Sequence, residues 1–218
     1  MILLLLSAAF ASPLNPWGSA TAPGASVVNP YLYVYPDAIN PIVYGSAGLS
    51  KRSDVYVGYG QLIPKAGAGE GSLEIFPRFF PVSALGLSPH LYWTPGSDSF
   101  ILAPELHTSV SAGKFSFIAN LNWKPIVSSG ELSTGSVVLL AAPEVKLSDR
   151  LSVYLEVDPT VSLEDDPFAL VVVPGFGLTL DSEGRHSLSA GLQIPVMPDV
   201  APASLGLSYC FVIPADGD

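Results

Sequence analysis

The sequence is poor in charged residues, in cysteine and in basic clusters. Charged residues make up 13% of the 218 positions, about half of the share that is typical of soluble domains. The single cysteine, Cys210, excludes a disulfide framework and a cysteine-based zinc site. Nine Lys and Arg against nineteen Asp and Glu give a net charge of -10, which excludes the basic footprint of a nucleic-acid-binding protein.

The chain also lacks an apolar run long enough for a transmembrane helix, although its mean hydropathy is +0.44. The longest run, residues 1-11, ends in the small-x-small site Ala9-Phe10-Ala11, which is typical of a signal peptide. A hydrophobic first strand is the alternative interpretation. Residues 12-26 are rich in Pro, Gly, Ala and Ser, and we expect an irregular leader there.

From Val27 onward, segments of about 9 to 13 residues with alternating polarity are separated by turn-like clusters. We expect them to form one domain over residues 27-213, followed by a short acidic tail at 214-218. The twelve expected strands are 27-35, 40-49, 54-63, 72-80, 83-93, 99-111, 114-124, 136-147, 150-162, 168-180, 186-197 and 203-213.

Within each segment the two alternating faces differ in chemistry. Along residues 151-163 one face begins Leu151, Val153, Leu155, while the other includes Glu156 and Asp158. All charged residues that we place inside strands share the polar face. They are Glu74, Arg78, Glu105, Lys124, Glu144, Lys146, Glu156 and Asp158.

Strands with alternating polar and apolar side chains occur in two architectures, a soluble sandwich and an outer-membrane barrel. The polar face is mostly Ser, Gly, Thr, Asn and Tyr, which suits a crowded barrel interior better than a solvated surface. The segments are also as long as tilted membrane-spanning strands. We therefore predict an all-β fold, a single antiparallel transmembrane β-barrel of about 12 strands, with 10 or 14 as alternatives. Tyr35, Trp93, Trp123 and Phe168, near segment ends, are expected to form interfacial girdles.

Eight prolines fall inside the expected strands. Each proline removes a hydrogen-bond donor from the ladder, so we expect bulges or strand ends at these positions. They are Pro30, Pro41, Pro77, Pro89, Pro104, Pro143, Pro159 and Pro174.

The last segment carries the most specific pattern. Ser204, Gly206, Tyr209 and Phe211 match the polar, glycine, hydrophobic and aromatic positions of a barrel assembly signal, although the chain continues beyond the aromatic residue. Over about residues 27-213 the chain resembles a bacterial outer-membrane β-barrel of the small porin-like or transporter-like kind. The resemblance implies export, insertion into the outer membrane, and the barrel assembly machinery, outer-membrane lipid and lipopolysaccharide as partners. It implies short periplasmic connectors, which we expect at 50-53, 81-82, 112-113, 148-149 and 181-184, and it names no substrate.

Candidate chemistry lies on the polar face. His107-Thr108-Ser109, with Asn120 or Asn122 nearby, resembles the residue types of outer-membrane phospholipase A, but a lumen network is the plainer interpretation. Glu156 and Asp158 stand two apart on one face, as in a glycosidase or metal site, but Glu144 and Lys146 on the preceding strand carry opposite charges and make an ion-paired lumen the plainer interpretation. Such a belt of carboxylates and lysine is expected to steer ions and small solutes. We predict no catalytic, metal or cofactor site. The expected lumen set is Glu74, Arg78, His90, Glu105, His107, Asn120, Asn122, Lys124, Glu144, Lys146, Glu156 and Asp158.

The function predicted from this pattern is passive or weakly selective passage of small solutes, without enzymatic activity. Two alternatives stay open at this stage: a closed structural or surface-interaction barrel, and a secreted soluble β-sandwich that binds a ligand. The sequence leaves the oligomeric state undetermined.

Overall fold

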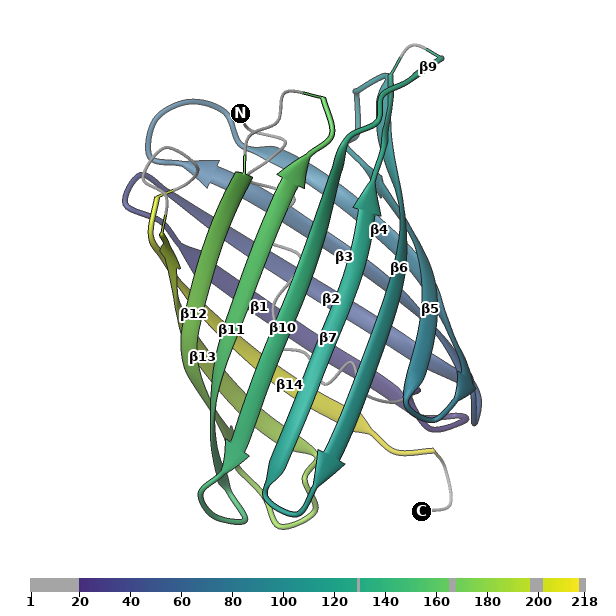
Figure 1. Cartoon of the computed structure of the whole chain (residues 1–218), viewed down its shortest axis with the longest axis vertical. Helices are drawn as coiled ribbons and strands as arrows, with labels where there is room; N and C mark the ends of the chain where they lie inside the picture. Colours follow the sequence, from purple (N-terminus) through teal and green to yellow (C-terminus); the bar gives the residue numbers. More distant parts are fainter. Residues whose placement is uncertain (1–19, 129, 165–167, 197–201, 216–218) are drawn as a thin grey trace.

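The computed structural model describes residues 20-128, 130-164, 168-196 and 202-215. The expected signal peptide, most of the leader and the end of the tail lie outside the described residues. The chain forms an all-β barrel whose strands are tilted against its long axis (Figure 1). The barrel strands are β1 Ser26–Val34, β2 Ala38–Ser50, β3 Ser53–Pro64, β4 Glu70–Val82, β5 Leu85–Trp93, β6 Ser99–Ala112, β7 Phe115–Lys124, β10 Ser136–Lys146, β11 Leu151–Ser162, β12 Phe168–Thr179, β13 His186–Pro195 and β14 Ser204–Ile213.

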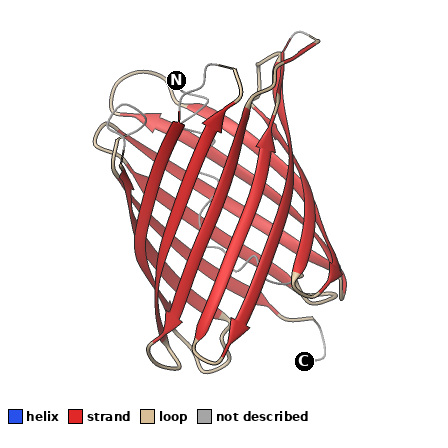
Figure 2. Ribbon diagram, viewed as in Figure 1, coloured by secondary structure: helices blue, strands red, loops and turns tan. Residues whose placement is uncertain are grey.

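The sheet closes on itself. Every barrel strand pairs antiparallel with two neighbours, β1 with β14 and β5 with β6 among them, so that twelve strands form a ring. The predicted strand number is confirmed, and the β-sandwich alternative is wrong because the sheet has no second layer. The described residues contain strands and connections but no helix (Figure 2). None of these residues forms a helix long and apolar enough to cross a membrane.

Two short strands lie outside the ring. β8 Ile126–Ser128 pairs with the first residues of β6, and β9 Glu131–Leu132 pairs with β8. Figure 1 shows this hairpin rising above one rim of the barrel. The connection between β7 and β10 therefore extends the sheet beyond the ring.

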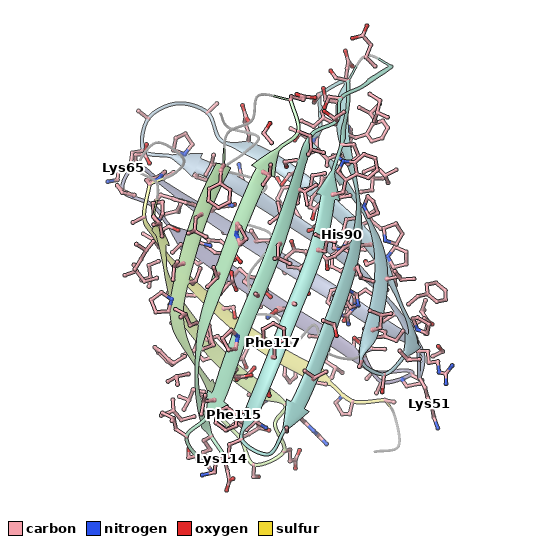
Figure 3. All side chains as sticks on the ribbon, viewed as in Figure 1. Lys51, Lys65, His90, Lys114, Phe115 and Phe117 are labelled. Carbon is pink, nitrogen blue, oxygen red and sulfur yellow. The ribbon has the colours of Figure 1, made fainter. Side chains whose placement is uncertain are left out.

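Alternation of side chains decides which face points inward. Along β5, Gly86, Ser88, His90 and Tyr92 are buried, while the residues between them are exposed. The exposed phase is apolar around the ring, as Phe115 and Phe117 of β7 illustrate (Figure 3). An apolar exterior around a polar interior is the arrangement that a lipid environment requires.

Several glycines on the inner face make room for neighbouring rings. A Cβ atom at Gly58 would lie 2.3 Å from the ring of Tyr44, and one at Gly175 would lie 2.3 Å from the ring of Tyr154. A Cβ atom at Gly86 would meet His107. These positions exclude larger residues, because each glycine is covered by the side chain of an adjacent strand.

The prolines do not end strands or create bulges, which corrects the expectation. All eight lie inside strands, and the register shifts occur elsewhere, between Gly48 and Ser50 and between Phe79 and Val82. Instead, the ladder keeps its register. Pro30 has no pair with Tyr209 on β14, but it keeps its pair with Val43 on β2.

Side chains replace two of the donors that the prolines lack. Asn29 Nδ2 donates to the Tyr209 carbonyl at 2.8 Å, beside Pro30. Ser88 Oγ donates to the Pro77 carbonyl at 2.9 Å, beside Pro89. The residue before the proline thus supplies from its side chain the hydrogen bond that the backbone cannot make.

The predicted girdle is found in part. Trp93, Trp123 and Phe168 are exposed at strand ends. Tyr35 instead packs against the buried aromatic cluster inside the barrel, so its expected place in the girdle is wrong. At the opposite rim, Asp181 holds the β12-β13 turn by accepting the N–H groups of His186 and Arg185, which keeps the pKa of this exposed carboxyl below its usual range.

Candidate functional site: the barrel lumen

Ten of the twelve residues predicted to line the lumen are buried on the inner face. Glu144 is half-buried and Lys146 is exposed, because both lie at the end of β10. The ten buried residues are Glu74, Arg78, His90, Glu105, His107, Asn120, Asn122, Lys124, Glu156 and Asp158. They are divided between two walls joined by β7, and the walls differ in how their charges are paired.

The first wall, called here the aromatic wall, is the inner face of β1 to β6. It contains residues that sequence reasoning missed: Asp54 and the buried rings of Tyr31, Tyr33, Tyr44, Tyr56, Phe76 and Tyr92. These rings occupy the same alternating strand positions as the polar residues. Their position in that alternation, rather than their polarity, was the signal that would have identified them as inward-facing. Asp54 lies at the first position of the strand expected at 54-63.

Arg78 and Asp54 form the most complete contact of the aromatic wall. Arg78 Nε donates to Asp54 Oδ1 at 2.9 Å and Arg78 Nη2 to Oδ2 at 2.6 Å, with both side chains almost fully buried. The guanidinium carbon also lies 4.4 Å from the centre of the Tyr56 ring. Thr21 donates its backbone N–H to the same carboxylate at 2.6 Å, so the chain before β1 contacts the inside of the barrel. This paired, stacked arrangement is typical of a structural ion pair.

Glu74 and His90 form a second network higher on the same wall. His90 Nδ1 lies 2.6 Å from Glu74 Oε1, and the Tyr44 hydroxyl donates to Glu74 Oε2. The His90 ring, which Figure 3 labels, stacks on Phe76 with a centroid distance of 4.1 Å. Both oxygens of this buried carboxylate therefore have partners.

Glu105 and β7 continue the network. Asn122 Nδ2 donates to Glu105 Oε2 at 2.9 Å, and His107 Nδ1 lies 3.5 Å from Glu105 Oε1. Lys124 is buried, lies 5.7 Å from the centre of the Tyr92 ring and interacts electrostatically with Glu74, Glu105 and Asp158. Lys124 thus connects the aromatic wall to the opposite side.

The second wall, called here the carboxylate wall, is the inner face of β10 to β12. Glu156 is 0% exposed and Asp158 is 8% exposed. Their neighbours on the adjacent strands are aliphatic: Val173 lies opposite Glu156 and Val171 opposite Asp158 on β12. On β10, the buried Ala142 and Leu140 take the corresponding positions, since Ala141 pairs with Val157.

The expected ion pairs of the carboxylate wall are not formed in the described part of the chain. Glu144 lies opposite Tyr154 and Lys146 opposite Ser152, one or more positions too close to the rim to reach the pair. The strand register, which the short turn between β10 and β11 fixes, places aliphatic residues where the hypothesis required a lysine.

The hydrolase-like residues do not assemble either. His107 lies opposite Asn120 and its ring packs against Phe80 at 5.1 Å. Ser109 instead bonds through its backbone N–H to the Ala84 carbonyl, near the rim. The described residues also contain no group of three or more His, Cys, Asp or Glu side chains placed to hold a metal ion.

The residues of the expected assembly signal lie on both faces of β14. Ser204 and Gly206 point inward, and the Ser204 hydroxyl donates to Gln193 Oε1 at 2.5 Å. Tyr209 and Phe211 are on the outward phase, where the His186 ring stacks on Phe211 at 4.7 Å. Recognition of this strand by an assembly machinery stays a prediction.

A closed antiparallel ring with an apolar exterior and a polar interior defines a transmembrane β-barrel of the outer-membrane type. No protein-family model matches the sequence. No curated protein is significantly similar to it either.

Solved structures with the same fold include outer-membrane channels. An outer membrane channel from Pseudomonas putida F1 has a TM-score of 0.67 at 11% identity, covering 91% of this chain and 99% of the channel. The KdgM porin in complex with disordered oligogalacturonate has a TM-score of 0.63 at 8% identity, covering 85% of this chain and 98% of the porin. The NanC porin has a TM-score of 0.58 at 7% identity, covering 86% and 98%. The chain therefore shares the fold of bacterial outer-membrane porins and channels.

Proposed function

We propose that this protein is a porin-like channel of the bacterial outer membrane that allows passive or weakly selective passage of small solutes. The observation that carries the proposal is the inner face. It bears buried Asp, Glu, His, Arg, Lys and Asn side chains on strands whose outer face is apolar. A barrel that only anchors itself in lipid needs an apolar exterior, but it does not need charges inside.

The shared fold supports the same proposal. The similar solved structures are channels and porins of about this length, and one of them holds an oligogalacturonate. Barrels of about eight strands are filled by side chains and those of sixteen or more hold wide channels, so twelve strands suit a narrow path for small solutes. We propose further that the chain has no enzymatic activity, and that lipopolysaccharide and the barrel assembly machinery are its partners in the membrane.

Ion conductance across a planar bilayer tests the proposed passage. Residues 12-218 are refolded into detergent, a heat-modifiable band verifies the folded barrel, and the protein is added to a bilayer in symmetric potassium chloride. We expect discrete current steps. The Val153→Arg variant, whose charge faces lipid, serves as the control because it is expected to insert poorly and to give no steps.

One observation favours a second candidate, a closed structural barrel. Arg78, Phe76, His90 and Glu156 are almost fully buried, so side chains fill much of the interior at their level. A folded, inserted protein that carries no current over many insertions would favour this candidate and would contradict the channel.

A further inference from the structure

The carboxylate wall compensates its two buried carboxylates only in part, because among the described residues the one cation facing them is Lys124 on β7, which interacts electrostatically with Asp158. Both Glu156 oxygens and Asp158 Oδ1 lack a hydrogen-bond partner among the residues that the structure describes. A carboxylate removed from water is strongly destabilised unless donors or a cation replace its hydration. By contrast, Asp54 and Glu74 on the aromatic wall have both oxygens occupied. Lys124 offsets one of the two negative charges, so a second positive charge or a proton from outside the described chain is needed to balance the pair.

The remaining unpaired atoms of the lumen point to the same kind of partner. The buried amide oxygens of Asn29, Asn40, Asn120 and Asn122 have no donor within the described residues. Asn120 on β7 lies at the same level of the inner face as Asp158 on β11. Leu140 on β10, the strand between them, is level with both. Across the described residues, the buried atoms that lack a partner include no amide, ammonium or guanidinium nitrogen. The set also contains imidazole nitrogens of His107 and the hydroxyls of Tyr31 and Ser72, which can donate or accept. The carboxylate and amide oxygens can only accept, so a solute that satisfies them has to bring N–H or O–H donors.

The surroundings of the pair decide which cation fits. Calcium prefers six to eight oxygen ligands, and magnesium keeps an octahedral shell of oxygen. Val171, Val173, Leu140 and Ala142 flank the pair and supply none. Tyr154 lies two positions before Glu156 on the same face, with its hydroxyl bonded to the Ala190 carbonyl at 3.1 Å. An aliphatic and aromatic surface beside two carboxylates suits a cation that carries an apolar body.

We propose that Glu156 and Asp158 form a binding site for organic cations with N–H donors, such as protonated amines and guanidinium compounds, during their passage through the barrel. This inference rests on the proposed channel function and names its solute class. The cationic group donates to Glu156 and Asp158, while the carbon chain contacts the aliphatic residues of β10 and β12. Anionic solutes are disfavoured at this level of the lumen, because they add charge of the same sign.

Equilibrium binding to the folded protein in detergent tests the site without requiring an open path. Butylguanidinium is the probe, because a guanidinium group stays charged at all working pH values. Isothermal titration calorimetry at pH 7 compares the unaltered chain with Glu156→Gln, Asp158→Asn and the double variant. Glu131→Gln, an identical change on the exposed β9, is the matched control. Butyltrimethylammonium has the same charge and carbon chain without N–H donors, and serves as the control ligand.

We expect saturable binding that weakens about tenfold or more in each single variant, as the loss of a charged hydrogen bond implies, and stays unchanged in Glu131→Gln. Butyltrimethylammonium is expected to bind more weakly than butylguanidinium. Equal affinity in the unaltered chain and the double variant would overturn the site. So would the absence of binding at pH 7, which would leave a shared proton as the group that neutralises the pair.

Conductance separates this inference from the proposed function on which it rests. Current steps without butylguanidinium binding would keep the channel and reject the cation site. Binding in a protein that gives no steps would keep the site and reject passage. In a conducting barrel, we expect a reversal potential that favours potassium over chloride and moves toward zero in the double variant, with heat-modifiable bands verifying that each variant is folded.

Discussion

Two carboxylates on the aromatic wall and two on the carboxylate wall are held in opposite states. On the aromatic wall, Asp54 pairs with Arg78 through two hydrogen bonds and Glu74 is held by His90 and Tyr44. On the carboxylate wall, Glu156 has aliphatic neighbours and no described donor. Burial alone therefore does not identify a functional charge. The difference in pairing does, because satisfied networks stabilise the barrel whereas unsatisfied groups need a further explanation.

Breaking the Arg78–Asp54 pair is expected to have the largest effect. Arg78→Leu leaves the buried Asp54 without its cation, although the Thr21 N–H still donates to it, and is expected to cost about 3 to 5 kcal/mol of unfolding free energy. Urea unfolding in detergent, followed by tryptophan fluorescence, measures the loss. The double variant Arg78→Leu, Asp54→Leu removes both charges and is expected to recover much of the stability. A double variant as unstable as the single one would show that the pair is not what the wall loses.

An added charge tests whether the carboxylate wall faces inward. Val153→Arg on β11 places a cation in lipid and is expected to cost about 2 to 4 kcal/mol near the middle of the membrane. Ser152→Arg, the adjacent residue on the inner phase, is expected to be better tolerated. The yield of heat-modifiable protein after refolding into lipid vesicles measures both variants. Equal yields of the two variants would contradict the assignment of an inner and an outer face on this wall.

The side-chain donors beside the prolines give a smaller effect, on the aromatic wall only. Asn29→Ala leaves the Tyr209 carbonyl without a donor and is expected to lower the unfolding free energy by about 1 to 3 kcal/mol. The loss should shrink when the Pro30→Ala substitution is added, because it restores a backbone N–H next to the lost side-chain donor. Urea unfolding of both variants and of Pro30→Ala alone provides the comparison. An undiminished loss in the double variant would contradict the replacement of the missing donor.

The strands and their faces could be predicted because both depend on a local property, the alternation of polarity along each segment. The hydrogen bonds beside the prolines could not be predicted in this way. A missing N–H is visible in the sequence, but the donor that replaces it depends on which carbonyl lies opposite. Asn29 and Tyr209 are 180 residues apart, and only closure of the ring between β1 and β14 brings them together.

The candidate site was predictable to the same extent. Strand phase placed Glu156 and Asp158 inside the barrel, but their partners depend on the register between β10 and β11. The short connector predicted at 148-149 already places Lys146 near the start of the next strand, so the register set by that turn keeps this lysine away from the pair. The buried tyrosines were missed for a different reason: a residue with an apolar body and a polar end fits either face of a membrane barrel.

The smallest expected change in stability comes from Glu156→Gln, and its sign completes the comparison between the walls. The substitution keeps the size of the side chain and removes the charge. Because the aliphatic neighbours and the described residues offer no partner for that charge, the variant is expected to keep its stability or to gain up to about 1 kcal/mol in the absence of an added cation. The urea titration used for Arg78→Leu measures this change in unfolding free energy.

Butylguanidinium should then raise the unfolding midpoint of the unaltered chain but not that of Glu156→Gln, since a ligand stabilises only the state that binds it. A loss of several kcal/mol in Glu156→Gln would mean that this carboxylate is held as firmly as Asp54, and the two walls would then differ in composition but not in role.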